Sequence, residues 1–468
     1  MKHLIATTLC SLCCGAAAAQ PAYTLSQLKD SALANNAAMH TARLAADAAA
    51  EQRREAFTNY FPNVSATGLW FNANRGMAKM DVNPAEVVPA PLAATLAQTF
   101  PPEALAALAN PVSVAMMKSG TIGSVTATQP VFAGGQIVNG NRLARVGEEV
   151  SRLQMELAEN EVERTTEQYY WQLVSLNEKK RTLDAVDSLL TAIARDVDVA
   201  VRAGVAMRND LLQVQLRQND IASQRLKLNN GISLVSLLIK QYCGLRGPSR
   251  PTRPSPAPSL SREGSDYSID IVMPDIDGQS YLLPSLGREG SGVSLLPEYR
   301  LLEKQVEAAS LQKKLAVGKN LPTVAVGAGY NYHNLMENDR TFAMVFATVS
   351  VPISDWWGGS HAVKRQKLEL QKAEEQLADN AQKLSIRAQK AYNDVAEAQQ
   401  QLQLAQRSIE QAKENLRLNR NYYEAGTSRM ADLLEAQLLY QQARDRRTDA
   451  FADLQNKLLD YRQATAQQ

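Results

Sequence analysis

The chain has 468 residues, a formal net charge of +2 and 45% hydrophobic residues. A near-neutral chain with no basic tract argues against a nucleic-acid-binding protein. Residues 1–19 combine the basic Lys2, a short apolar core and a small-residue run at Ala17–Ala19, which predicts a secretory signal peptide. Beyond it there is no run of roughly 18 apolar residues, so if this chain spans a membrane it is expected to do so as a β-barrel and not through helices.

The cysteines support an exported protein without a disulfide framework. Three of the 4 cysteines (Cys10, Cys13 and Cys14) lie within the expected signal, so cleavage leaves only Cys243. Attachment of a lipid to a cysteine near the end of the signal is an alternative, but the residues that precede Cys13 and Cys14 fit that pattern poorly.

The first half of the mature chain, 20–245, predicts a helix, two strands and a long helical hairpin. The helix over 24–60 is rich in Ala, Glu and Arg and ends at Pro62. A proline-rich surface loop separates the two strands and carries a short helical stretch. The expected bounds are 63–73 and 120–131 for the strands, 77–118 for the loop, 103–109 for its helix and 135–243 for the hairpin.

The strands have the alternation expected of a wall that faces lipid. In TVAVGAGYNYH (323–333) one face is apolar and ends in two tyrosines, whereas the other is small and polar. A lipid-facing strand has this arrangement, while an ordinary soluble hairpin is the alternative. The apolar face carries Val324, Val326, Ala328, Tyr330 and Tyr332, and Val64, Ala66, Gly68 and Trp70 repeat the theme more weakly.

The helical stretches carry heptad seams. Apolar residues recur at steps of three and four from Leu143 to Leu157 and from Leu183 to Val197. Nothing interrupts the pattern from Gly135 to Arg202, which at 1.5 Å per residue gives a helix of about 100 Å. A glycine then follows each long helix, Gly204 in the first half and Gly426 in the second, and predicts the tip of a helical hairpin.

The second half repeats the first. Pro130 and Pro352 are 222 residues apart, and Gly204 and Gly426 have the same separation. A tandem duplication is therefore expected, with its second copy in 294–468. This copy comprises a helix over 297–320, strands at about 322–333 and 342–353 and a helical hairpin at about 359–463. Between the copies, 246–293 is a low-complexity linker, within which 267–274 is a candidate edge strand.

These features together resemble the TolC-like outer membrane efflux proteins. The resemblance rests on the hairpin motifs GVAMRNDLLQVQ (204–215) and GTSRMADLLEAQ (426–437), and on PVFAGG (130–135) and PISDWWGG (352–359) where strands lead into helices. It implies an α+β membrane protein in which three chains form one tube. Four strands per chain would close a 12-stranded β-barrel in the outer membrane of a Gram-negative bacterium, continued by a periplasmic α-helical barrel.

The resemblance also implies a function. The homotrimer would be the exit duct of a tripartite efflux pump, receiving small molecules from an inner-membrane transporter, proton-driven or ATP-driven, through a periplasmic adaptor. The alternatives are the exit duct of a type I protein secretion system and a non-conducting periplasmic coiled-coil scaffold. The chain is not expected to be an enzyme or to hold a cofactor or metal, since its 4 histidines are widely spaced and no catalytic motif occurs.

The resemblance assigns roles to residues at the hairpin tips. Asp432 and Glu435 share a helix face and would form a carboxylate ring in the pore, although Asp432 is equally placed to cap its helix. Tyr423 would bond Asp210 and hold the tip closed, with Arg429 as a second tether that stands one position from where it is expected. The tips themselves, with Gly204, Ala206, Gly426 and Ser428, would dock the adaptor.

Overall fold

The computed structural model describes residues 22–75, 78–82, 89, 92, 101, 112–116, 119–245, 269–274, 293–335, 338–353 and 355–465. The expected signal peptide, the short helix near 103–109 and most of the linker 246–293 lie outside these residues. In chain order the elements are α1 (Leu25–Asn35), α2 (Ala37–Thr58), β1 (Asn63–Asn72), β2 (Ala78–Val82), β3 (Val112–Met116), β4 (Ser119–Ala133), α6 (Gln136–Arg202), α7 (Arg208–Tyr242), η1 (Val293–Leu295), α8 (Pro297–Lys319), β5 (Thr323–Leu335), β6 (Asn338–Ser350), α9 (Asp355–Glu424) and α10 (Met430–Thr465).

The single helix expected over 24–60 is two helices, because Asn36 interrupts it. Asn36 has an extended backbone (φ −67°, ψ 136°). Its side-chain oxygen accepts from the backbone N–H of Ala38 at 2.7 Å, and its amide donates to the carbonyl of Tyr242 at 3.0 Å. Asparagine competes with helical hydrogen bonds in this way, so the break has a local cause.

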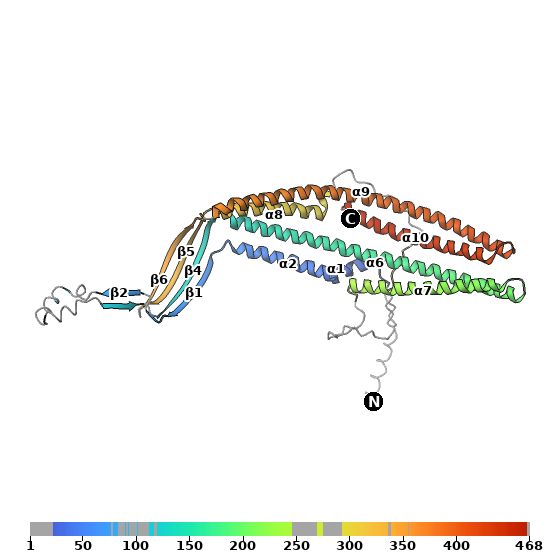
Figure 1. Ribbon diagram of the computed structural model, residues 1–468, viewed down its shortest axis with the longest axis horizontal. Coiled ribbons are helices and arrows are strands. Elements are labelled where there is room, and N and C mark those ends of the chain that lie inside the picture. The colour runs from blue at the N-terminus through green and yellow to red at the C-terminus, as the bar shows by residue number, and fades with distance from the viewer. Residues whose placement is uncertain are drawn as a thin grey trace, which may run out of the picture. The chain divides into compact units, whose positions relative to one another are not determined.

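Four strands form one antiparallel sheet in the order β1-β4-β5-β6 (Figure 1). Its register brings the apolar sets of both halves onto the same face: Ala66 pairs with Val125, which pairs with Tyr330. Val64 is likewise in line with Ala328 through the partner that they share on β4. A two-stranded ladder of β2 and β3, which the sequence did not predict, lies within the segment 77–118 that was expected to be a loop.

The opposite face of the sheet is not uniformly small and polar. Strand β6 contributes Phe342, Met344 and Phe346 to the face that holds Gly327 and Gly329. A Cβ atom at Gly327 would overlap the ring of Phe346. The glycine therefore makes room for an aromatic ring that lies against the sheet, a role that the pattern of β5 alone does not reveal.

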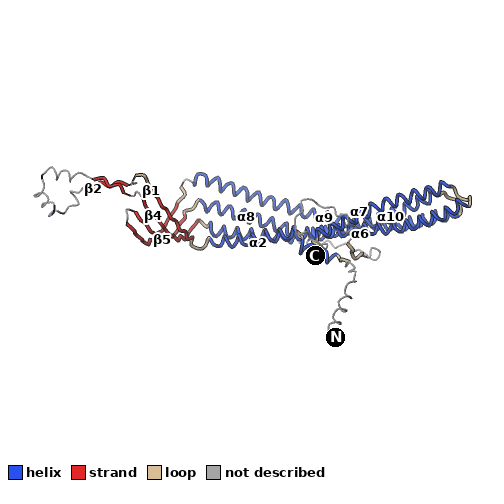
Figure 2. Tube along the Cα trace, turned by 90° about the horizontal axis from the view of Figure 1, so that it is seen from below, coloured by secondary structure: helices blue, strands red, loops and turns tan. Residues whose placement is uncertain are grey.

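The described residues form two compact units. One, called here the strand unit, consists of Ala50–Gly147 and Glu307–Gln371; the other, the helical unit, consists of Met1–Ala49, Glu148–Val306 and Lys372–Gln468. Each unit draws on both halves of the chain, so the units do not coincide with the two sequence repeats. In the strand unit, Figure 2 shows the strands in red and the helices with which they are continuous in blue.

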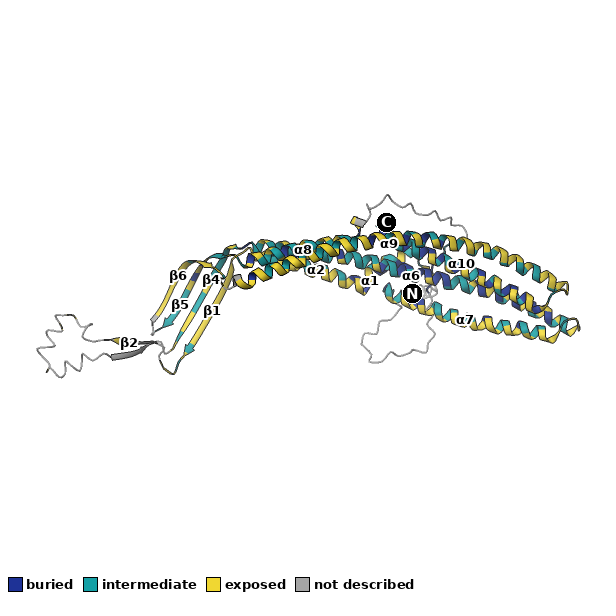
Figure 3. Ribbon diagram, turned by 45° about the horizontal axis from the view of Figure 1, so that its top comes forward, coloured by how far each residue is buried: buried dark blue, intermediate teal, exposed yellow. Residues whose placement is uncertain are grey.

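The core of the helical unit follows the predicted seam. Leu183, Val186, Leu190 and Val197 on α6 are all at most 5% exposed. They pack with Met430 and Leu433 of α10 in one cluster, so the heptad pattern correctly identified the buried side of α6. Buried residues (dark blue) are frequent along α6 in Figure 3, whereas the edge strands β1 and β6 are largely exposed and the inner strands β4 and β5 are mostly of intermediate burial.

The described piece of the linker packs against this unit. Tyr23 and Ile271 form a single parallel bridge, and the Tyr170 hydroxyl donates to the carbonyl of Val272 at 2.8 Å. Ile269 and Ile271 are 5% and 8% exposed. The candidate strand at 267–274 thus contributes one bridge.

Among the helices that the structure describes, none has the length of apolar sequence that a membrane crossing requires.

Candidate functional site at the helical hairpin tips

The two hairpin tips have the same backbone. Gly204 and Gly426 adopt φ of 75° and 72°, the left-handed region that favours glycine. The N–H of the next residue in each tip, Val205 or Thr427, bonds a carbonyl five residues earlier at 2.9 Å. This arrangement ends each helix and satisfies its last carbonyls, so the glycines are required by the turn itself.

Each returning helix starts with a capping aspartate. The Asp210 carboxylate accepts from the backbone N–H of Met207 at 3.3 Å, and the Asp432 carboxylate accepts from that of Arg429 at 3.0 Å. Both aspartates lie in the first turn, where a negative charge also offsets the helix dipole. The capping interpretation of Asp432 is therefore realised. It leaves the pore ring as a separate proposal, because Asp432 and the neighbouring Glu435 remain exposed in the single chain.

Tyr423 lies close to Asp210 without bonding to it. The side chain is partly buried against the cluster of Leu183, Val197 and Met430. Burial and the nearby Asp210 charge both raise the pKa of the Tyr423 hydroxyl. Among the hydrogen bonds of the described residues none joins the two side chains, so the latch between them stays a prediction.

The remaining tip residues have simpler surroundings. Arg429 is exposed, and in the part of the chain that the structure describes its guanidinium has no ion-pair partner. Its backbone N–H, rather than its side chain, makes the contact to Asp432. Ala206 and Ser428 are half-buried beside the exposed glycines. The two tips differ in chemistry. Val205 and Met207 in the first tip are apolar and are 81% and 74% exposed, whereas the corresponding residues of the second tip are the polar Thr427 and the charged Arg429.

A buried polar layer near the tips was missed by the sequence reasoning. Arg217 on α7 donates to the side-chain oxygens of Gln437 at 3.4 Å and Gln441 at 3.0 Å on α10, and Gln441 donates to Gln224 at 3.0 Å. Burial lowers the pKa of Arg217, and Gln437 is fully buried. The signal was present in the sequence, because Gln437 is the final residue of the tip motif GTSRMADLLEAQ.

Asp445 is a second buried polar group on α10. Burial, together with the charge of Asp449, raises the pKa of its carboxyl group, against the opposing charge of Lys179. One of its oxygens is buried without a hydrogen-bond partner. Burial therefore disfavours the ionised form of this carboxyl group in the folded protein relative to the unfolded chain.

We expect Asp445→Asn to raise the stability of the protein at neutral pH. A folded-state pKa above the unfolded value means that stability increases as the pH falls through the folded pKa, and that this gain is complete below the unfolded value. The wild type should thus gain stability from pH 8 to about pH 4 more steeply than the variant does. Thermal unfolding across this range checks the slope. Equal slopes would show that Asp445 is not responsible.

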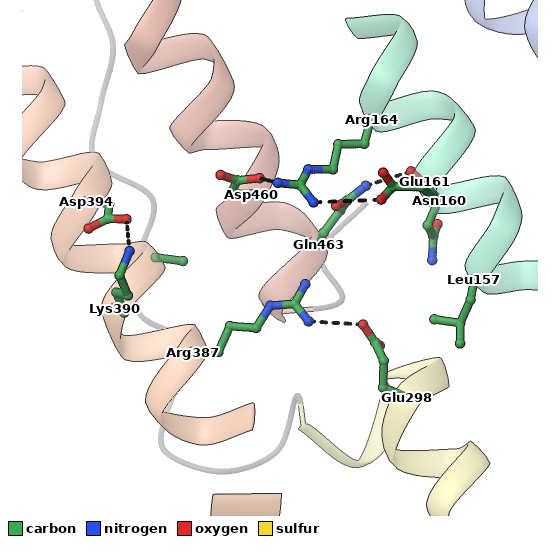
Figure 4. Close-up of a pocket in the computed structure, with 11 residues that line it drawn as sticks. Leu157, Asn160, Glu161, Arg164, Glu298, Arg387, Lys390, Asp394, Asp460 and Gln463 are labelled. Atoms are coloured by element: carbon green, nitrogen blue, oxygen red, sulfur yellow. Dashed lines mark hydrogen bonds and ion pairs between the residues drawn. The ribbon is translucent and has the colours of Figure 1, made fainter. Parts of the chain in front are cut away.

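Ion pairs cluster around a cavity of ≈ 460 Å³ in the helical unit (Figure 4). Arg164 of α6 pairs with Asp460 of α10 at 3.1 Å, and Arg387 of α9 pairs with Glu298 of α8 at 3.1 Å. Four helices meet here through opposite charges of nearly equal number. These ion pairs therefore serve to hold the helices together rather than to select a charged ligand.

Within the described residues no group of His, Cys, Asp or Glu is placed to hold a metal ion.

Comparison with known proteins agrees with this architecture. Residues 297–467 match the family model described as outer membrane efflux protein. The fold is similar to the outer-membrane channel OprN (TM-score 0.73, 15% identity, covering 95% of this chain and 90% of that one). It is also similar to the CmeC channel of Campylobacter jejuni (0.70, 16%, 95% and 85%) and the open MtrE channel of Neisseria gonorrhoeae (0.69, 16%, 94% and 88%). No curated protein matches the chain.

Proposed function

We propose that this protein is the outer-membrane exit duct of a tripartite efflux pump, because residues 297–467 match the family model of outer membrane efflux proteins and 95% of the chain shares the fold of the outer-membrane channel OprN. The observation that carries the proposal is the sheet. One of its faces is apolar and exposed, with Val64 at 66%, Tyr330 at 58% and Val345 at 86%. Lipid is the environment in which such a face is stable.

The sheet supports a trimer. Strands β1 and β6 stand at its two edges, each with one side unpaired within the chain. In lipid every unpaired backbone group costs several kcal/mol, so the edges must pair with other strands. Three copies with four strands each would close a 12-stranded barrel. The tandem duplication would then give the tube six similar repeats.

The helices supply the periplasmic part of the duct. Helices α6 and α9 contain 67 and 70 residues, a contour of about 100 Å each. Conduction through such a tube is passive, because the energy comes from the inner-membrane transporter. The hairpin tips would receive the adaptor, and copies of Asp432 and Glu435 would form a ring of carboxylates that favours cations.

Replacing Tyr423 with phenylalanine is expected to raise single-channel conductance. The substitution removes only the hydroxyl group, which is the part that could bond Asp210, and keeps the packing of the ring. Conductance in planar bilayers and sensitivity of cells to large antibiotics report the change. Tyr422→Phe is the matched control, since Tyr422 is 51% exposed and lies outside that cluster. Unchanged behaviour of the Tyr423 variant in both assays would contradict the proposed hydrogen bond between Tyr423 and Asp210.

Site-specific crosslinking in intact cells tests the function. A photocrosslinking residue at Ala206 or Ser428 should capture a periplasmic adaptor, whereas one at Arg407, on α9 away from the tips, should not. Recovery of a proton-driven transporter with the adaptor supports efflux, and recovery of an ATP-driven exporter supports the alternative, protein secretion. Failure of the purified protein to conduct in bilayers would overturn the duct.

A further inference from the structure

A cleft of ≈ 750 Å³ in the strand unit is lined by arginines and aromatic rings. It lies between α2 and the start of α6, directly before the chain enters the sheet at β1. No carboxylate is among its lining residues. Arg54 pairs with Glu51 at 2.5 Å on the exposed surface, and Arg53 and Arg145 also have interaction partners. We call it the arginine cleft, and its principal residues are Arg53, Arg54, Phe57, Tyr60, Arg142 and Arg145.

The side of the sheet on which the arginine cleft opens follows from a comparison with a second hollow. Helices α2 and α6 are in contact at Asn141, whose amide donates to the carbonyl of Ala56 at 2.9 Å. The second hollow is lined by Asn63, Pro130 and Ala133, which the strand register places on the face of Gly327 and Gly329.

The two hollows use different sides of α6. The hollow on the glycine face is lined by Gln136, Ile137 and Gly140, and the arginine cleft by Val138, Arg142 and Arg145. On a helix of 3.6 residues per turn these sets point in different directions, on either side of Asn141. The arginine cleft is therefore on the apolar side. Gln129, whose register neighbour is Val326 on the apolar face, agrees with this by donating to the carbonyl of Tyr60 at 3.2 Å.

The second half of the chain carries positively charged residues at the equivalent sequence positions. At the spacings of the sequence repeat, 260 residues for α2 and 222 for α6, the four arginines become Lys313, Lys314, Lys364 and Lys367. No acidic residue occurs in 308–320 or 356–368, although the whole chain is nearly neutral. Positively charged residues therefore recur in both helix pairs near the sheet, and in the second half no acidic residue accompanies them.

This combination fits an anionic lipid headgroup. Arginine binds phosphate oxygens with paired N–H donors, and exposed cations are attracted to anionic membrane surfaces. Tyrosine and other aromatic rings are favoured at the boundary between lipid and water, and Phe57, Tyr60 and Phe61 form a cluster with ring centroids 5.5 and 5.6 Å apart. The neighbouring apolar face offers a surface for acyl chains.

We propose that the arginine cleft binds the phosphate headgroup of an anionic phospholipid in the inner leaflet of the outer membrane. The inference rests on the proposed function, because it requires the apolar face to lie in that membrane. The lysines of the second half form the equivalent, weaker contact. Each trimer would thereby be surrounded by bound lipid at the level where its helices begin.

Binding of defined lipids to the intact purified protein tests the proposal. Native mass spectrometry compares phosphatidylglycerol with phosphatidylethanolamine of identical acyl chains, for the wild type and for a variant with Arg53, Arg54, Arg142 and Arg145 all replaced by glutamine. The wild type should prefer phosphatidylglycerol by about tenfold, and the glutamine variant by no more than about twofold. The matched control replaces the same four arginines with lysine; it keeps the charge but loses the paired N–H donors, so its preference should fall between those of the wild type and the glutamine variant.

Three results would overturn the site. They are an equal preference in the glutamine variant, no preference in the wild type, or displacement of the lipid by millimolar inorganic phosphate, which would indicate a free-phosphate site. Folding of the glutamine variant is checked from its oligomeric state and thermal unfolding. If it does not fold, the double variant Arg142→Gln with Arg145→Gln takes its place. Conductance of the wild type in phosphatidylethanolamine bilayers is measured separately. Conduction there would support the exit-duct proposal even if the lipid-binding proposal is contradicted.

Discussion

Replacing Gly134 with alanine is expected to destabilise the protein by about 2–5 kcal/mol, although it adds a single methyl group. Gly134 adopts φ of 57°, which costs any other residue strain. A Cβ atom there would also overlap the carbonyl oxygen of Gly318 in α8, and a Cβ at Gly318 would overlap the carbonyl of Gly134. Two backbones are in direct contact here, and a backbone cannot yield as a flexible side chain does.

Chemical unfolding in detergent measures this loss as a free energy of unfolding. Gly140→Ala is the matched control, because Gly140 lies within α6 and a Cβ atom there meets nothing within 4 Å. That variant should be neutral or more stable by about 0.5–1 kcal/mol, since alanine favours a helix interior. Equal stability of the two variants would contradict the close approach of Gly134 and Gly318.

Replacing Phe451 with alanine is expected to cost about 3–5 kcal/mol. Phe451 is 1% exposed and packs edge-to-face on Trp171, with ring centroids 5.7 Å apart. It belongs to the cluster that joins α1, α6, α7 and the linker residues Ile269 and Ile271. Truncation would leave a cavity among several elements, and none of them can fill it alone.

Phe451→Leu separates loss of the cavity-filling volume from loss of the ring. It keeps most of the buried volume and should cost about 1–1.5 kcal/mol. Thermal unfolding of the three proteins side by side gives the order. An alanine variant as stable as the leucine variant would mean that the cluster collapses around the gap, contrary to the packing of Trp171.

Most of the fold could be predicted because it depends on local periodicity. The seam from Leu183 to Val197 specifies a buried helix side, and the alternation from Val324 to Tyr332 specifies a sheet face. The β2–β3 ladder was missed because its five-residue strands lie in a proline-rich segment. The break at Asn36 depends on a contact with Tyr242, which is distant in sequence and therefore invisible to a local pattern.

The candidate site was predicted less completely. The glycine turns and the capping position of Asp432 follow from short-range rules, and the structure shows both. The layer around Arg217 depends on which face of α7 meets α10, and periodicity does not fix that choice. The motif marked Gln437 as special without indicating that it is buried or that its partner is an arginine.

The open edges at β1 and β6 also govern how mixed populations of chains would behave. If three sheets close one barrel, a single copy that cannot pair through β6 leaves the whole ring unsealed. Assembled ducts would then fall with the cube of the normal fraction rather than in proportion to it. A defective allele at this edge would be dominant over the normal one, whereas a defect in the expected signal peptide would merely lower the dose.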